Sequence, residues 1–274
     1  MATRGGQLGD VTVAFDDAGS GPAIVLLPPF PFDRRVYAAN ARALLASGQR
    51  VIALDYPGFG QSPPLAATPT GAALAMTALA EQVRALMDRL EVASATLLGL
   101  SMGGYVALAF AARFPRYLRA LVLADTRAAA DGPAARDGRA TALRTIDAQG
   151  VDAYLTQSLP RLLAPDARAE LLAAVHGLAE RRATTLRAGI AALRDRPDRT
   201  GELGHIACPT LVLCGAVDQV SPTAEMRGIA AAIAGSRFVE LAGAGHLSNL
   251  EAPAAFDAAL GDFLRSLPPE GPSS

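Results

Sequence analysis

The chain of 274 residues contains no lysine, and all 25 of its basic residues are arginine. A P-loop needs a lysine beside its glycines to reach the phosphates of a nucleotide, so that class of phosphate site is excluded. Another glycine pair, Gly58 and Gly60, follows the apolar run RVIALD. It would need a third glycine at position 63 to make a dinucleotide fingerprint, and Pro63 stands there. The sequence therefore predicts no nucleotide site.

Cysteine and histidine are also scarce. The two cysteines, Cys208 and Cys214, flank a predicted strand, where an extended chain separates them by roughly 20 Å, too far for a disulfide. Neither has another cysteine two to four residues away, and the three histidines are widely scattered. We therefore expect reduced thiols, no metal site and no cofactor.

Long apolar runs are missing as well. No stretch approaches the roughly 18 apolar residues of a membrane-spanning helix, and the first residues, MATRGGQLGD, lack the apolar core of a secretion signal. The net charge of -1 gives no electrostatic reason to expect a nucleic-acid or membrane-surface partner. We expect a cytoplasmic globular protein, monomer or homodimer, whose partner is a small molecule.

Short apolar runs rich in leucine and β-branched residues recur along the chain and predict strands buried on both faces. They cover residues 11–15, 23–27, 50–54, 95–100, 120–124, 210–214 and 237–241. Segments of helical period lie between several of them, at residues 37–46, 71–90, 102–113 and 253–267. This alternation predicts an α/β fold with a mostly parallel sheet covered on both sides by helices.

Residues 127–200 break this alternation. They show only helical patterns rich in alanine, leucine and arginine, interrupted by four prolines. We interpret them as a helical lid inserted in a core of residues 1–126 and 201–267, and residues 268–274 as a disordered tail. The lid has a slight excess of arginine over acid. We interpret this excess as a solvated surface, with a weak preference for anionic substrates as the alternative.

The stretch GLSMGGY, residues 99–105, fits G-x-S-x-G where the predicted strand ATLLGL meets a predicted helix. A sharp turn at that junction holds its central residue in a sparsely populated conformation, and Gly99 and Gly103 remove side chains that would collide across it. Ser101 would project at the carboxyl edge of the sheet, near a helix N-terminus that favours negative charge. We expect Gly104 to let that helix pack closely on the sheet.

A nucleophilic serine needs a base, and three histidines are available. His246 follows the predicted strand RFVEL in the glycine-rich loop GAGH, so it would emerge at the same edge of the sheet as Ser101. His176 lies in the insertion and His205 precedes the strand PTLVLCG. We interpret both as surface or packing residues.

The base in turn needs a carboxylate that orients its ring. Asp218, in the loop GAVDQVSP, and Asp125, at the end of ALVLAD, each follow a predicted strand and could each reach the histidine. Asp55, at the end of RVIALD, is interpreted as a structural residue.

With Ser101, Asp218 and His246 in this order, each just beyond a strand, the chain resembles the α/β-hydrolase superfamily. The resemblance runs from about residue 11 to residue 267 and includes GLSMGG, DYPGFGQS, GAVDQVSP and GAGHLSNLEAP. It implies an eight-stranded twisted sheet, a lid between strands 6 and 7, and Asp218 as the acid. LLPPFPFDRRVY and HLSNLEAP look most like small bacterial carboxylesterases and 3-oxoadipate enol-lactonase-like enzymes.

The resemblance also implies an oxyanion hole made by the backbone N–H groups of Met102 and Phe30. The family usually has His-Gly before the second donor, where this chain has Pro28-Pro29. Proline lacks an N–H but leaves the donor of Phe30 in place, and Pro31 favours an extended Phe30. A cis bond before Pro29 or Pro31 is compatible with this loop.

We therefore expect a serine hydrolase that cleaves carboxylic esters through an acyl-enzyme, with Pro31, Tyr105 and Arg127 in the substrate pocket. Enol-lactone hydrolysis is the nearest alternative and predicts a basic group of the lid near the site. The arginines considered for that role are Arg127, Arg136 and Arg144. Cofactor-free perhydrolase or haloperoxidase activity, carbon–carbon bond hydrolysis and a non-catalytic ligand receptor of the same fold are further alternatives.

Overall fold

Residues 3–8, 11–64 and 74–269 of the protein are described from a computed structural model. Its strands form one sheet in the order β1-β2-β4-β3-β5-β6-β7-β8. β2 runs antiparallel to β1 and β4, and every other neighbouring pair is parallel. The strands are β1 (Thr3–Leu8), β2 (Val11–Ala18), β3 (Ala23–Leu27), β4 (Arg50–Leu54), β5 (Ala95–Leu100), β6 (Leu118–Ala124), β7 (Thr210–Gly215) and β8 (Arg237–Leu241).

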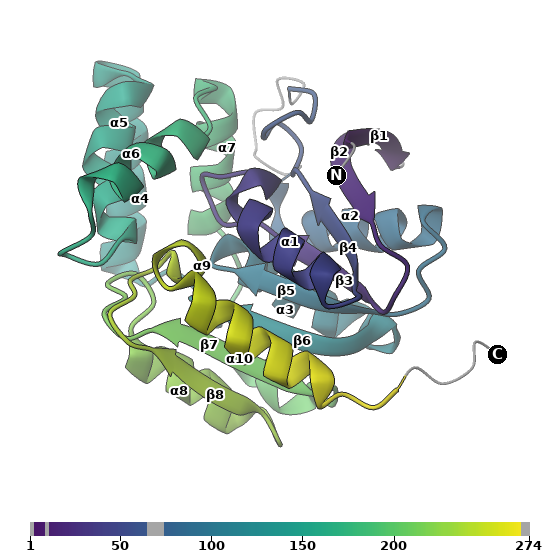
Figure 1. The fold of residues 1–274 in the computed structure, drawn as a ribbon. Helices are drawn as coiled ribbons and strands as arrows, with labels where there is room; N and C mark the ends of the chain where they lie inside the picture. Colours follow the sequence, from purple (N-terminus) through teal and green to yellow (C-terminus); the bar gives the residue numbers. More distant parts are fainter. Residues whose placement is uncertain (1–2, 9–10, 65–73, 270–274) are drawn as a thin grey trace.

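Helices cover both faces of the sheet. Figure 1 shows α1 and α10 in front of it, with α2 and α3 behind. These helices are α1 (Ala38–Ala46), α2 (Met76–Arg89), α3 (Met102–Arg113), α8 (Thr223–Ala232) and α10 (Pro253–Arg265), with α9 (Ser248–Glu251) as a short turn before α10. The predicted α/β fold with a mostly parallel eight-stranded sheet is therefore confirmed.

The core lies along the central strands β3, β5 and β6 and the helix α3. All residues of β3 and β5 are buried, and so are residues 102–111 of α3. A helix that is apolar nearly all round has to be covered on every side, and α3 packs against β3, β5 and β6 and also against α2. Because full burial of a leucine or valine contributes about 1.5–3 kcal/mol, this layer fixes the start of α3 rigidly against the sheet.

All seven predicted strands exist, and β1 is an additional one. Its sequence TRGGQL carries little apolar signal, and it forms by pairing with β2 along its whole length. The predicted helix over 71–90 begins at Met76 in the structure, and residues 71–73 lie outside the described range. Most of the predicted disordered tail, residues 270–274, also lies outside it.

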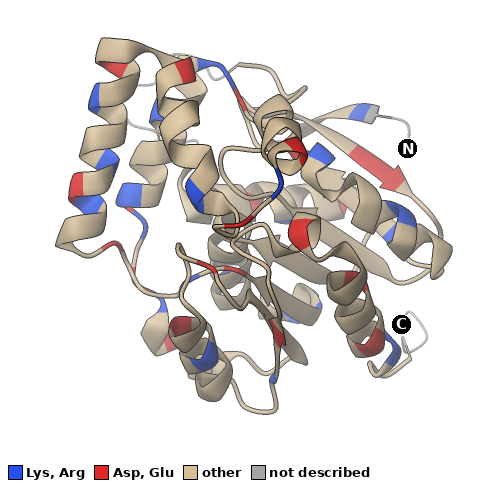
Figure 2. Cartoon of the chain, turned by 60° about the vertical axis from the view of Figure 1, so that its left-hand side comes forward, with Lys and Arg blue, Asp and Glu red and all other residues tan. Residues whose placement is uncertain are grey.

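The interval between β6 and β7 is helical, as expected. It contains α4 (Pro133–Gln149), α5 (Val151–Ser158), the 3₁₀ turn η4 (Leu159–Leu162), α6 (Ala169–Leu178) and α7 (Ala183–Arg194). These helices stand together beyond the carboxyl ends of the parallel strands (Figure 1). Acidic and basic residues are scattered over this group of helices (Figure 2). Among the helices of the described ranges, none is both long and apolar enough to span a membrane.

Candidate active site

Ser101 occupies the turn between β5 and α3 with φ 52° and ψ -113°, a left-handed conformation that costs a residue with a side chain about 1–3 kcal/mol. The glycines around it are required by close backbone contacts. A Cβ at Gly99 would lie 2.2 Å from the carbonyl oxygen of Gly103, and one at Gly103 would lie 1.9 Å from that of Leu27 in β3. The predicted strand-to-helix turn is therefore present, with its serine at the carboxyl edge of the sheet.

Gly104 has a different neighbour from the one expected. A Cβ there would lie 2.3 Å from Oγ1 of Thr126, just after β6, while Gly103 is the glycine that approaches a strand. The Thr126 hydroxyl donates a 2.7 Å hydrogen bond to the carbonyl oxygen of Ser101. Gly104 thus leaves room for the threonine that supports the serine turn.

Asp218 and His246 meet Ser101 at this edge. The hydroxyl oxygen of Ser101 lies 2.8 Å from Nε2 of His246, and Nδ1 of the same ring lies 2.8 Å from Oδ2 of Asp218. Asp218 follows β7 and His246 follows β8, so three separate loops contribute one side chain each. All three side chains are buried.

The hydrogen bonds around Asp218 favour one tautomer of the His246 ring. Its Oδ1 accepts the backbone N–H groups of Val220 at 2.7 Å and Ser221 at 3.0 Å, which leaves Oδ2 facing His246. A carboxylate at Nδ1 favours the tautomer with the proton on Nδ1, so Nε2 can accept the proton of Ser101. Burial alone lowers the pKa of His246, but the neighbouring Asp218 carboxylate raises it above its ordinary value of 6.5.

Asp125, the competing acid, has other partners. Its Oδ1 accepts the backbone N–H of Gly215 at 2.7 Å, its Oδ2 accepts the hydroxyl of Ser248, and its carbonyl oxygen accepts the hydroxyl of Ser221 at 3.1 Å. Complete burial raises the pKa of Asp125 from 3.8 to about 7. Asp125 therefore ties together the loops that carry Asp218 and the histidine, without bonding the histidine itself.

The residues expected to form an oxyanion hole also lie at this edge. The Phe30–Pro31 peptide bond is cis, and the N–H of Phe32 donates to the carbonyl of Pro29 at 2.8 Å, which closes a tight turn after β3. Met102 begins α3, where the first N–H groups of a helix have no partner within it. In the described part of the chain, the N–H groups of Phe30 and Met102 make no loop, turn or side-chain hydrogen bond.

Two of the expected pocket residues, Tyr105 and Arg127, line a cavity of about 10 Å³. The lining of this cavity does not include Ser101, Asp218 or His246. The Arg127 guanidinium forms a bidentate pair with Glu225 of α8 at 2.5 and 2.6 Å. Arg196 stacks on the Tyr105 ring at 4.3 Å and pairs with Asp131. Both expected residues thus pack the base of the insertion, and their contact with substrate stays a prediction.

Pro31, the third expected pocket residue, lies against the insertion: its carbonyl oxygen accepts the N–H of Glu180 at 2.9 Å. His176 lies on α6 and His205 ends the 3₁₀ turn η5 (Thr200–His205), so neither belongs to the loops around Ser101. Both cysteines are free. Within the described ranges, no cluster of histidine, cysteine, aspartate and glutamate is arranged to hold a metal ion.

Sequence reasoning missed Glu251, which lies within the motif HLSNLEAP but was assigned no role. Its Oε1 accepts the N–H of Gly245 at 3.0 Å, and its Oε2 accepts the N–H of Ala164 in the insertion at 2.7 Å. The N–H of Leu247 also donates to the carbonyl of Leu162 at 3.1 Å. The histidine loop is thus fastened directly to the insertion. The only sequence feature that pointed to this role of Glu251 is an acidic residue five positions after His246.

Residues 22–253 match the sequence profile of the alpha/beta hydrolase fold family. The chain belongs to this family. Among solved structures, this α/β-hydrolase is similar to a thermophilic esterase from Thermogutta terrifontis with malate bound. The TM-score is 0.88 at 32% identity, covering 97% of this chain and 99% of that one.

Two curated relatives give a similar picture. 3-Oxoadipate enol-lactonase 2 from Acinetobacter baylyi is 31% identical over 214 residues, which cover 77% of this hydrolase and 76% of the relative. The polyketide synthase ThaQ from Burkholderia thailandensis is 32% identical over 252 residues, which cover 90% of this chain but only 12% of that much longer protein.

Proposed function

We propose that this α/β-hydrolase cleaves carboxylic esters through an acyl-enzyme on Ser101. The observation that carries the proposal is the continuous series of hydrogen bonds from Ser101 through His246 to Asp218, with 2.8 Å at each step. A serine hydroxyl becomes an effective nucleophile when a histidine accepts its proton, and an oriented carboxylate stabilises the imidazolium that results.

In the first half of the reaction, the Oγ of Ser101 attacks the ester carbonyl carbon while its proton moves to Nε2 of His246. The tetrahedral intermediate then collapses: the bond to the leaving oxygen breaks, and that oxygen takes the proton from His246. In the second half, a water molecule gives a proton to Nε2 of His246 and attacks the acyl carbon. The bond between that carbon and Oγ of Ser101 then breaks, and Oγ takes the proton back from His246. The products are one carboxylic acid and one alcohol.

The oxyanion formed in each half would be held by the N–H groups of Phe30 and Met102. Met102 contributes the field of a helix N-terminus, since the first turn of α3 begins there. Losing one such donor typically costs about 10² to 10³ in rate. The placement of the Phe30 turn therefore affects the rate in addition to the placement of the three side chains. The helices α4 to α7 would act as the lid that excludes water and limits substrate size.

Enol-lactone hydrolysis is the second candidate, favoured by the relative of that name. A carboxylated lactone calls for a cationic partner, but the three arginines considered for that role are engaged elsewhere. Arg127 pairs with Glu225, Arg136 with Asp195, and Arg144 with Thr141 on its own helix. This arrangement favours uncharged esters over carboxylated lactones. Perhydrolysis and carbon–carbon bond hydrolysis would use the same three side chains and enter the test as further outcomes.

A rate panel distinguishes these reactions. Nitrophenyl esters of rising acyl length, uncharged aliphatic lactones and carboxylated enol-lactones are compared at equal concentration, with and without peroxide, and with Ser101→Ala as the blank. We expect the uncharged esters to give the highest kcat/KM and the Ser101→Ala protein to match the buffer rate. Preferential turnover of the carboxylated lactones would replace the ester proposal with the second candidate.

A further inference from the structure

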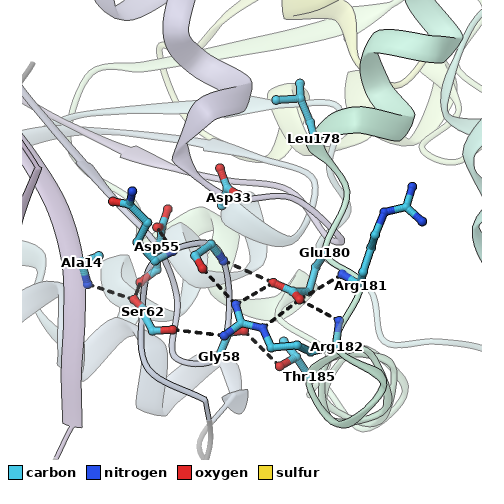
Figure 3. A network of polar contacts seen from close by, with 12 residues as sticks. Ala14, Asp33, Asp55, Gly58, Ser62, Leu178, Glu180, Arg181, Arg182 and Thr185 are labelled. Atoms are coloured by element: carbon cyan, nitrogen blue, oxygen red, sulfur yellow. Dashed lines mark hydrogen bonds and ion pairs between the residues drawn. The ribbon is translucent and has the colours of Figure 1, made fainter.

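The loop after β4, residues 55–62, forms a rigid platform beside the proposed oxyanion turn. The buried Asp55 accepts the backbone N–H groups of Arg34 and Gln61, each at 2.9 Å. The Ser62 hydroxyl donates to the Asp55 carbonyl at 2.8 Å and accepts the N–H of Ala14 at 2.9 Å (Figure 3). Both ends of the loop are thus fixed to the sheet, which agrees with the structural role expected for Asp55.

The segment between α6 and α7 is hydrogen-bonded to this platform through Glu180 and Arg182 (Figure 3). The Arg182 guanidinium donates to the carbonyls of Gly60 at 3.0 Å and Ser62 at 3.4 Å, and binds Glu180 through Nε and Nη2 at 2.9 Å each. Oε2 of Glu180 also accepts the N–H of Gly60 at 3.3 Å. Thr185, at the start of α7, adds a 3.0 Å hydrogen bond to the carbonyl of Gly58.

The segment between α6 and α7 also contacts the oxyanion turn. The backbone N–H of Glu180 donates to the carbonyl oxygen of Pro31, the residue directly after Phe30, at 2.9 Å. The Phe30 ring packs edge-on against Phe59 of the platform at 6.1 Å between ring centroids. On the α7 side the same ring lies over Gly189, where a Cβ would come within 2.5 Å of its atoms. The Phe30 ring thus packs between the platform and α7.

We propose that Glu180 and Arg182 are positioning residues for the Phe30 oxyanion donor: they hold the insertion on the platform, and the insertion holds Pro31 and the Phe30 ring. This inference rests on the proposed function, since it assigns a purpose to the placement of one oxyanion donor. The pair is suited to the task because a bidentate ion pair fixes direction as well as distance. The Glu180 side chain is only 8% exposed, so water cannot easily replace its five N–H donors.

Two matched substitutions one residue apart test the inference: Arg182→Gln and Arg181→Gln. Arg181 projects outward from the same segment and pairs with Asp152 inside the insertion, so its loss removes an equal charge without touching the platform. Three quantities are measured for each protein: kcat per active site titrated with a fluorophosphonate, KM for one nitrophenyl ester, and Ki for a trifluoromethyl ketone. The ketone forms a tetrahedral adduct that carries an oxyanion, so its Ki reports on the oxyanion donors.

We expect Arg182→Gln to lower kcat per titrated site roughly 10- to 100-fold, because a displacement of about 1 Å can cost 10² in rate. Ki should weaken by a similar factor and KM should stay within about threefold. Arg181→Gln should leave all three unchanged. If Arg182→Gln reduces only the melting temperature or the fraction of active sites, with kcat and Ki per site unchanged, the pair is merely structural and the inference is overturned.

A second pair of variants tests the position of Phe30 from the side of α7 and keeps the ion pair between Glu180 and Arg182. Gly189→Ala places a methyl group against the Phe30 ring, whereas Gly138→Ala on α4 adds one where nothing lies within 4 Å. The inference predicts the same loss of kcat and Ki for Gly189→Ala alone, and equal values for the two variants would contradict it. Turnover by the wild-type protein, with Ser101→Ala as its blank, tests the proposed function separately.

Discussion

The Asp125→Asn substitution is expected to remove a pH-dependent destabilisation from the folded protein. Asp125 is completely buried, and burial raises its pKa from 3.8 to about 7. Asparagine can keep both contacts: its carbonyl oxygen can accept the N–H of Gly215, and its amide can donate to the Ser248 hydroxyl, which reverses the direction of the second hydrogen bond. The substitution therefore removes the ionisation and leaves the contacts in place.

The size and sign of the effect follow from the two pKa values. The folded protein holds the Asp125 proton more tightly than the unfolded chain, so the free energy of unfolding falls as pH rises from about 4 to about 7. The full difference corresponds to roughly 4 kcal/mol. Between pH 5 and pH 8 the same relation gives a loss of about 2–3 kcal/mol in the wild-type protein that the variant lacks.

Urea unfolding of the wild type and of Asp125→Asn at several pH values between 5 and 8 measures this directly. Titrations of groups far from Asp125 occur equally in both proteins and cancel in the difference between their unfolding free energies. That difference therefore reports on Asp125 together with the linked titration of its neighbour His246. Asp137→Asn, at an exposed position of α4, serves as the control and should follow the wild type. A difference between wild type and Asp125→Asn that does not change with pH would mean that Asp125 has the same pKa in the folded and unfolded protein.

Three further predictions concern the same edge of the sheet. The kcat/KM value should fall with decreasing pH around a His246 pKa above 6.5, because only the neutral ring accepts a proton; a flat pH–rate profile down to pH 5 would contradict this. Gly103→Ala should lower kcat roughly 100-fold, because its Cβ would lie 1.9 Å from the carbonyl of Leu27 and force the start of α3 to shift, whereas Gly138→Ala should not. Glu251→Gln should reduce the free energy of unfolding by about 1–3 kcal/mol in urea titrations, since an amide offers one acceptor oxygen to two backbone N–H groups; an unchanged midpoint would argue against that role.

The parts of the fold that the sequence predicts are those with local signals. The central strands are short apolar runs bounded by turns, and the serine turn shows two glycines at fixed distances from Ser101, so both could be located without any long-range information. β1 lacks such a signal, because TRGGQL becomes a strand only through its hydrogen bonds to β2. Its position could not be inferred before its partner was known.

The contacts of charged residues are long-range, and this limits what a sequence can predict about the site. Gly60 and Glu180 are 120 residues apart in the sequence. No sequence pattern shows which of the many arginines and acidic residues form ion pairs with one another. The same limit applies to the choice between Asp125 and Asp218. Both follow strands, and only the path of the loop after β7 turns Asp218 toward His246 while Asp125 reaches Gly215 and Ser248.

Ser101 is expected to carry the acyl group during turnover. The most direct measurement is covalent labelling: the wild type and Ser101→Ala are treated with a fluorophosphonate and with a nitrophenyl ester quenched in acid, and the modified peptide is identified by mass. We predict one adduct per chain, located on Ser101, together with a burst of nitrophenol, and neither adduct nor ester turnover in Ser101→Ala. Undiminished turnover in Ser101→Ala, or an adduct on another residue, would contradict an acyl-enzyme on Ser101.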